Sequence, residues 1–472
     1  AAACALSNAE LAKIRASGLS VSASAAGTLA VNAVTQAATA NLGILTISGA
    51  AALSFSGTST FSGGLIASTA LAGGMSLAAN AELIGLAGST IALGRFNVGA
   101  LALTVSADEI NLTSGAASVY GTGTLTLRPV TATQPINLGA AADAGPASLD
   151  LTSADLLTIL GTGFASVTLG ADGFTGAITL AAAVNTTVPN LIIEGDDATS
   201  GLIRIDNAFT NTDAGRSLSF RAPVRLGASV GTNAGPIEFQ RPVVLAEAIG
   251  PTVSTGAGAG NLSFGAAATI DGTAGGVTES LILEAGTGTL SLGAAIGSLE
   301  PLGSLSLSGG TALALPDITL VADLSVTKSS GTVTDTGILT VPGTASFTLP
   351  AAQSLVLDVA SSDFGTFRIT SGTNASVIDA SGIILGASAI TGTLTVNANG
   401  PISQSGAVSA SGLTVTSSGG AALTQANTVS SFAATNTASG TIELVNAAAP
   451  LTVGSVAQYS GGTVTIRNTG AI

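Results

Sequence analysis

Residues 392–416 read GTLTVNANGPISQSGAVSASGLTVT, in which the run Leu394-Thr395-Val396 returns as Leu413-Thr414-Val415. The same step leads on to Phe432 and then to Leu451. Apolar and polar residues alternate around these positions, which is the pattern of a half-buried strand. A repeat of about 20 residues is typical of a solenoid, because a single coil cannot bury its apolar side alone. The stretch therefore predicts regular β-helix coils of about 19–22 residues.

Short alternating runs of the same kind recur along the rest of the chain. Between them lie Gly, Asn and Asp, which favour turns. Clear examples are 101–105 (LALTV), 124–127 (TLTL), 177–180 (AITL) and 304–307 (SLSL). We therefore predict an all-β fold, a right-handed parallel β-helix, and about 23 coils at about 20 residues each.

A longer repeat indicates short helices inserted between the strands. Residues 6–14 (LSNAELAKI) align without gaps on residues 151–159 (LTSADLLTI), with a looser third copy at 359–367 (VASSDFGTF). Ser7 with Glu10, and Thr152 with Asp155, have the spacing of a capping box at a helix N-terminus. Gly18 and Gly163 are the expected helix ends. We predict strands after each helix, at 28–31 and 177–180.

The composition of the 472 residues excludes several functional classes. The chain has no His, which excludes Ser-His-Asp catalysis and His-ligated metal sites. Its single cysteine, Cys4, cannot form an internal disulfide or a Cys-rich metal site. With 12 basic and 26 acidic residues the net charge is −14, so nucleic acid and anionic membranes would be repelled. Ser, Thr, Asn or Gly interrupts every apolar run before it is long enough for a membrane-spanning helix.

Several segments resemble the interior repeats of filamentous-haemagglutinin-like bacterial exoproteins. They are residues 400–408 (GPISQSGAV), 412–416 (GLTVT), 6–11 (LSNAEL), 431–432 (SF) and 449–453 (APLTV). The resemblance implies a long β-helix adhesin at the bacterial surface or in the medium, of the kind exported by two-partner secretion. It carries over no catalytic or binding residue, and the Asn-Pro-Asn-Gly-Ile export signature is absent.

The densest group of charges is the only part of the sequence that suggests catalysis. It lies between Glu194 and Arg241 and consists of Glu194, Asp196, Asp197, Asp206, Asp213 and Glu238 with Arg204, Arg216, Arg221, Arg225 and Arg241. Paired carboxylates could serve as acid and base in glycoside hydrolysis. Ion pairs between the arginines and nearby acids are the simpler interpretation. Oxygen ligands for calcium are offered by residues 170–173 (GADG), 195–197 (GDD) and 206–207 (DN), but none has a known calcium-loop spacing.

These observations combine into one prediction for the whole chain. We expect a first β-solenoid module over residues 1–150 opened by a short helix, a second over 151–390, and the regular coils over 391–472, all in one continuous rod. We expect a secreted or cell-surface structural or adhesive protein of bacterial origin, a fibre or filament subunit or an adhesin stalk. A polysaccharide-degrading enzyme and a surface-layer protein are the alternatives. We predict no catalytic, cofactor-binding or metal-binding residues and no cofactor. The expected partners are further copies joined end to end and surface glycans, with no nucleic acid and no membrane span.

Overall fold

The computed structural model is an all-β solenoid of about 19 turns, with 55% of residues in strands and 3% in helices. It describes residues 6–23, 28–49, 52–69, 74–143, 145–159, 163–198, 202–247, 250–273 and 279–472. Cys4 lies outside these residues. The chain divides into two compact units, unit 1 (Ala1–Pro242) and unit 2 (Val243–Ile472). The predicted solenoid is confirmed, whereas the predicted division into three modules stays a prediction.

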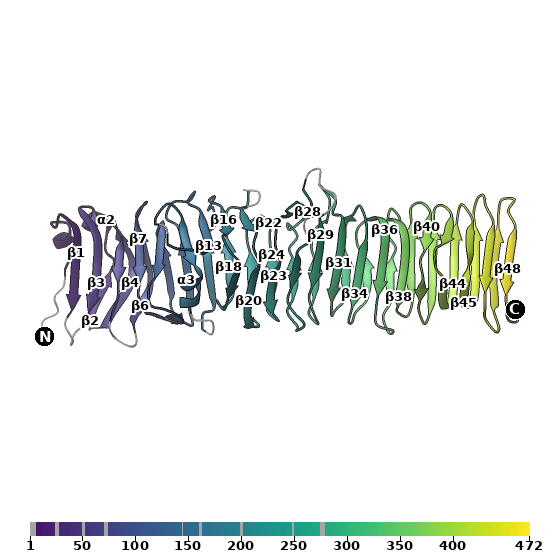
Figure 1. The fold of residues 1–472 in the computed structure, drawn as a ribbon, viewed down its shortest axis with the longest axis horizontal. Helices are drawn as coiled ribbons and strands as arrows, with labels where there is room; N and C mark the ends of the chain where they lie inside the picture. Colours follow the sequence, from purple (N-terminus) through teal and green to yellow (C-terminus); the bar gives the residue numbers. More distant parts are fainter. Residues whose placement is uncertain are drawn as a thin grey trace. The chain divides into compact units, whose positions relative to one another are not determined.

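Unit 1 is built from parallel strands that recur once per coil (Figure 1). Its first sheet contains β1 (Ala16–Ala23), β3 (Leu42–Gly49), β5 (Leu65–Ala67), β7 (Thr90–Leu93) and β10 (Glu109–Leu112). Its second sheet contains β2 (Thr28–Asn32), β4 (Ala52–Phe61), β6 (Met75–Gly85), β8 (Phe96–Gly99), β9 (Ala102–Ser106), β11 (Val119–Gly121), β12 (Thr124–Arg128), β15 (Ser166–Gly170), β18 (Leu191–Glu194), β21 (Leu218–Phe220) and β24 (Ile237–Phe239). Further strands are β13 (Ile136–Ala140), β14 (Leu149–Thr152), β16 (Ile178–Leu180), β19 (Ile203–Ile205), β22 (Val224–Leu226), β17 (Val184–Thr186), β20 (Phe209–Ala214) and β23 (Val230–Asn233).

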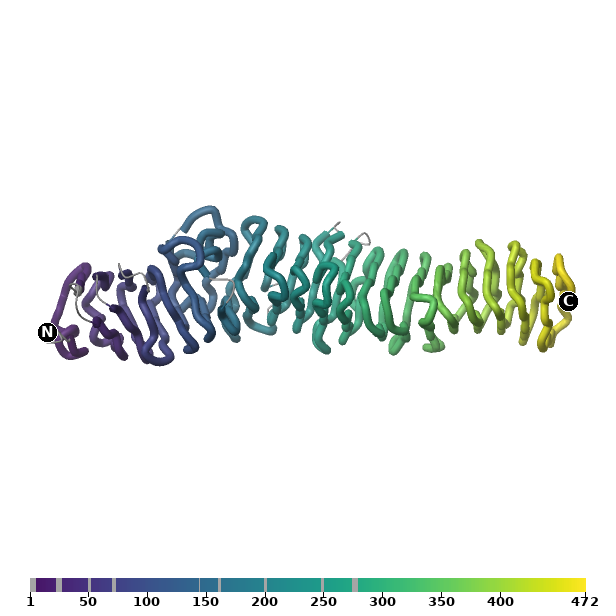
Figure 2. The backbone as a smooth tube through the Cα atoms, turned by 90° about the horizontal axis from the view of Figure 1, so that it is seen from below, coloured from purple at the N-terminus to yellow at the C-terminus, as the bar shows by residue number. Residues whose placement is uncertain are grey.

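Unit 2 repeats the same principle with more regular coils, which follow one another from teal to yellow in Figure 2. Its first strands are β25 (Val243–Leu245), β26 (Thr252–Ser254), β27 (Leu262–Phe264), β28 (Ile270–Asp271), β29 (Ser280–Glu284), β30 (Leu290–Leu292), β31 (Ser304–Gly309), β32 (Leu313–Leu315), β33 (Ile318–Thr319), β34 (Leu324–Lys328), β35 (Val333–Asp335), β36 (Leu339–Thr348) and β37 (Leu355–Leu357). The remaining strands are β38 (Asp363–Ser371), β39 (Ala375–Asp379), β40 (Ile383–Leu385), β41 (Ser388–Ala389), β42 (Thr393–Ala398), β43 (Ile402–Gln404), β44 (Val408–Ser417), β45 (Ala421–Asn436), β46 (Ile442–Asn446), β47 (Thr452–Gln458) and β48 (Val464–Asn468).

The core consists of ladders of apolar side chains, one from each coil. In unit 1, Leu103, Leu125 and Val167 stand in register on β9, β12 and β15, and each is almost fully buried. In unit 2, Leu394 pairs with Leu413 and Leu413 with Phe432, which confirms the first two steps of the period predicted for these coils. Stacking at this spacing removes the apolar surface of each coil from water, at about 25 cal/mol per Å².

Two expectations at this level are wrong, because the coils are less uniform than the sequence pattern. Phe432 pairs with Val453 rather than Leu451, although Leu451 is buried. The coils number about 19 rather than 23. In unit 1, Thr124 pairs with Ser166, so residues 124–166 hold an additional strand and a helix between successive turns.

The helical inserts are α1 (Asn8–Leu11), α2 (Gln36–Thr39) and α3 (Ser153–Thr158). Both predicted capping boxes are present, from Ser7 and Glu10 in α1 and from Thr152 and Asp155 in α3. Gly18 and Gly163 do not end these helices. Gly18 lies inside β1 and α3 ends at Thr158, because each helix gives way to a strand pairing before its glycine is reached. Within the described ranges, no helix has the length and apolar character needed to cross a membrane.

The third predicted copy, residues 359–367, forms a turn followed by β38 instead of a helix. Asp363 occupies the position of the capping acid, but it is the first residue of the strand. Its neighbour Phe364 donates its N–H to Asp379 Oδ2 at 2.8 Å and is buried, so strand packing prevails over local helix propensity.

Glycines allow the turns of successive coils to approach one another closely. Gly440 has φ +102°, and a Cβ there would lie 2.3 Å from the carbonyl oxygen of Gly419 in the preceding coil. A Cβ on Gly462 would lie 1.7 Å from the Gly440 carbonyl oxygen. No larger residue fits this corner without moving the backbone.

Candidate functional site

The charged group between Glu194 and Arg241, all within unit 1, is arranged as ion pairs. Arg221 lies 3.6 Å from Glu194, Arg225 binds Asp206, and Arg241 binds Asp197. In each pair a guanidinium faces a carboxylate, and the side chains are partly exposed. Exposed pairs of this kind contribute little to stability and supply no free acid and base.

The other charged residues of this group do not complete a catalytic pair. Asp196 follows β18, whereas Asp213 lies on β20 of a different sheet. Glu238 accepts a hydrogen bond from Ser219 Oγ at 3.3 Å. Arg204 is exposed beside Arg225 on the neighbouring strand, and Arg216 is half-buried just after β20. The simpler interpretation of the charges as ion pairs therefore agrees with their geometry.

The suggested calcium ligands are not gathered into a site. Among the residues that the structure describes, no three His, Cys, Asp or Glu side chains are placed to hold a metal ion. Asp206 and Asp197 are bound to arginines. Asp172, in the 170–173 turn, instead borders a pocket that the sequence did not predict.

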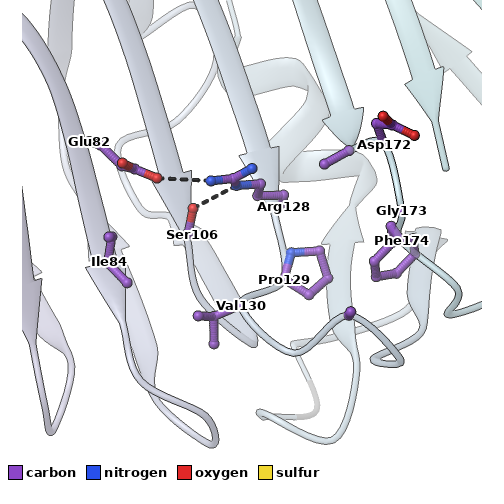
Figure 3. Close-up of a pocket in the computed structure, with 11 residues that line it drawn as sticks. Glu82, Ile84, Ser106, Arg128, Pro129, Val130, Asp172, Gly173 and Phe174 are labelled. Atoms are coloured by element: carbon purple, nitrogen blue, oxygen red, sulfur yellow. Dashed lines mark hydrogen bonds and ion pairs between the residues drawn. The ribbon is translucent and has the colours of Figure 1, made fainter. Parts of the chain in front are cut away.

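This pocket, of about 290 Å³, lies over the ends of β6, β9 and β12 and beside the turn after β15 (Figure 3). The polar side of the pocket begins with Arg128 on β12, whose side chain reaches across β9 to β6. Its Nη2 lies 2.9 Å from Glu82 Oε1 and its Nε donates to Ser106 Oγ at 2.9 Å. Asp172 lies on the opposite side of the Arg128 side chain from these two partners.

The apolar side of the pocket comes from two turns. Pro129 and Val130 follow β12, Phe174 follows β15, and Ile84 stands near the end of β6. Phe174 is 4% exposed, so its ring is largely fixed by packing. The pocket thus combines charged groups with an apolar wall, as small-molecule sites commonly do.

Hydrogen bonds hold the two turns in place. Asp108, which is 3% exposed, accepts from Thr131 N at 2.9 Å and from Thr131 Oγ1 at 2.8 Å. Thr175 N donates to Ala132 O at 2.8 Å, which ties the second turn to the first. The pocket is therefore preformed.

An even spacing along the sequence could have revealed part of this pocket. Ile84, Ser106 and Arg128 follow one another at equal intervals and pair in register on β6, β9 and β12. This interval lies within the coil length of about 19–22 residues predicted from the C-terminal sequence, but the alternation of apolar and polar residues alone does not single out these three positions. The same spacing could not have placed Asp172 in the pocket, because the α3 insert lies between Asp172 and β12 in the sequence.

Buried acids gather beside α3, close to its capping box. Glu109 is 1% exposed, and its Oε1 has no hydrogen-bond partner among the described residues. Burial, together with the nearby charges of Asp143, Asp150 and Asp155, raises the pKa of Glu109 to about 8, although Asp150 N donates to its carboxylate. Burial and the charges of Asp155 and Asp150 also raise the pKa of Asp143. Glu109 therefore holds its proton to a higher pH than an ordinary glutamate does.

Lys328 is a buried base in unit 2. It is 4% exposed, its Nζ has no hydrogen-bond partner among the described residues, and burial lowers its pKa to about 8. Lys328 pairs in register with Gly309. A Cβ on Gly309 would lie only 3.1 Å from the Lys328 Nζ. Glycine on the neighbouring strand thus makes room for the ammonium group.

Comparison with known families gives a match to the C-terminal part of the chain. Residues 302–371 and 372–439 each match a family described as repeats of unknown function (DUF5649). The boundary between the two copies falls between β38 and β39, so each copy comprises whole strands of unit 2. Searches among curated proteins and among solved structures found no match.

Proposed function

We propose that this chain is a structural or adhesive protein of the bacterial cell surface or its secreted material. The observation that carries the proposal is the series of apolar ladders in each unit, with small hydroxyl-bearing residues between them on the outer positions. Ser304, Ser306 and Ser308 alternate in this way with buried Leu305 and Leu307 on β31. Such an arrangement builds a stable surface without needing a catalytic centre.

Two further observations support a non-enzymatic role. Three of the six carboxylates of the densest charged group, those of Glu194, Asp197 and Asp206, are paired with arginines. The matched family consists of repeats, which agrees with a repetitive structural scaffold. An exported solenoid with a net charge of −14 would stay soluble outside the cell. Association of copies into filaments and contact with surface glycans belong to the same proposal.

The test is microscopy of native material combined with cell labelling. Negative-stain electron microscopy should show filaments or surface fibres, and an antibody against the chain should label intact cells. Labelling only after cell lysis would contradict the proposed location. Polysaccharide degradation that disappears in both Asp196→Ala and Asp213→Ala, with the fold intact by circular dichroism, would favour an enzyme instead.

A further inference from the structure

We propose that the pocket bounded by Glu82, Arg128, Asp172 and Phe174 binds a primary ammonium group carried on a short aliphatic chain. A free amine and the side chain of a lysine in a partner share this chemistry. The proposal does not depend on the proposed function, because it rests on the charge and shape of one preformed pocket in unit 1.

The charge balance of the pocket favours a cation. Arg128 is already neutralised by Glu82 and uses Nε and Nη2 for Ser106 and Glu82. Asp172 is exposed and makes no hydrogen bond to the residues that the structure describes. Asp172 interacts electrostatically with Arg241, but Arg241 is already paired with Asp197. One carboxylate charge therefore remains, within a chain of net charge −14 whose field attracts cations.

The apolar wall fits the aliphatic part of such a ligand. Pro129, Val130 and Ile84 present methylene and methyl groups, and Figure 3 shows Phe174 on the same turn as Asp172, with Gly173 between them. An alkyl chain against this wall would direct its ammonium group to Asp172. The volume of about 290 Å³ is at the lower end for ligand pockets, which suits a small group.

The hydrogen bonds behind the pocket reduce the cost of binding. The turn holding Pro129 and Val130 is fixed by the buried Asp108 through Thr131, and Asp196 N donates to Phe174 O at 2.7 Å. Little backbone has to be ordered when the ligand enters, so even a small amine is expected to bind with a Kd of about 1 mM.

The experiment measures binding of n-butylammonium to the full chain by ligand-observed NMR at low salt, with n-butanol as the uncharged probe of the same shape. We expect n-butylammonium to bind at least about tenfold more tightly than n-butanol. Asp172→Asn should weaken n-butylammonium binding about tenfold, and so should Glu82→Gln, which leaves Arg128 uncompensated. Circular dichroism confirms that each variant is folded.

Two matched variants in unit 2 serve as controls. Asp358→Asn removes another exposed aspartate, and Glu443→Gln breaks another exposed ion pair, that with Arg467. Neither should change the affinity. Nα-acetyl-lysine N-methylamide distinguishes the sources, because its binding indicates a lysine side chain and its failure indicates a free amine. Equal binding of the two butyl probes, or unchanged binding in Asp172→Asn, would overturn the proposal.

Discussion

At the scale of single residues, Lys328 is the buried charge whose removal should stabilise the protein. Its pKa of about 8 in the folded chain lies below the unfolded value of 10.5, so the folded state resists protonation. The resulting penalty is complete below pH 8 and disappears as the pH rises from about 8 to 10.5. Lys328→Met should therefore raise the free energy of unfolding at pH 7 by about 1–3 kcal/mol.

Urea unfolding at pH 7 and pH 10.5 checks this prediction. The stability gained by Lys328→Met should be smaller at pH 10.5. At that pH the wild-type lysine is neutral in the folded state, and half of the lysine is neutral in the unfolded state. The chain has one other lysine, Lys13, which is exposed, and Lys13→Met should change the stability little at either pH. A destabilised Lys328→Met variant at pH 7 would mean that the ammonium group has a stabilising partner.

Glu109 has the opposite pH dependence. Its folded-state pKa of about 8 lies above the ordinary value of 4.5, so the folded state holds its proton more tightly than the unfolded state does. The stability linked to this proton is complete below pH 4.5 and is lost as the pH rises through about 8. Glu109→Gln cannot ionise, and it should therefore be more stable than the wild type at pH 9.

The measurement is the difference in unfolding free energy between Glu109→Gln and the wild type from pH 5 to pH 9. The unfolding free energy of Glu109→Gln should increase relative to that of the wild type as the pH rises. Glu443→Gln, at a partly exposed position in unit 2, provides a baseline without such a trend. A flat difference for Glu109→Gln would show that the carboxylate is ionised in the folded protein.

At the scale of elements, α3 depends on one aspartate that serves two purposes. Asp155 closes the capping box with Thr152, and its Oδ1 also accepts the N–H of Leu112, far earlier in the sequence, at 2.9 Å. Asp155→Ala leaves this buried N–H without its partner and should cost about 2–4 kcal/mol.

Glu10 has the same position in the capping box of α1 but is exposed, so Glu10→Ala is the matched control. It should cost about 0.5–1 kcal/mol. Chemical denaturation of both variants at pH 7 compares the two. Similar losses would mean that the Leu112 contact adds nothing to the capping interaction.

The comparison of α1 and α3 also indicates how far the sequence could predict the elements. The alignment of residues 6–14 on 151–159 located both helices and both caps, because capping is a local interaction within one helical turn. It could not show that Asp155 is buried against Leu112, since that contact depends on the insert folding back. The 359–367 segment has the same local pattern, yet the buried Phe364 places it in a strand.

The pocket and the buried polar residues could not be predicted from the sequence either, because they too depend on contacts between coils. Asn446 Nδ2 donates to Asn468 Oδ1 at 3.0 Å, and Asn446 Oδ1 accepts from Val429 N at 2.8 Å. The two asparagines pair in register on β46 and β48 at a spacing within the predicted coil length, but the alternation of apolar and polar residues does not predict that a polar residue such as Asn446 is buried. The pocket was not predicted either, because the ion pair of Arg128 with Glu82 joins strands β12 and β6, which are not adjacent but are separated by β9.

At the scale of the whole molecule, the pairing pattern predicts that unfolding is not a two-state process. The strands of each unit pair with those of adjacent turns, as Leu305 does with Leu281 and Leu324. Stability in such an array is a sum over coils and their neighbouring interfaces, and long arrays lose cooperativity. We expect the calorimetric enthalpy of unfolding to exceed the van't Hoff enthalpy.

Hydrogen exchange should resolve the same behaviour along the chain. Amides of β34 and β44, where inward side chains are fully buried, should exchange slowly, while those of β47 and β48, whose residues are half-buried or exposed, should exchange earlier. The gradient follows from the apolar surface that each coil buries against its neighbours. Equal protection throughout, with matching enthalpies, would instead mean that the coils of both units open as one cooperative structure.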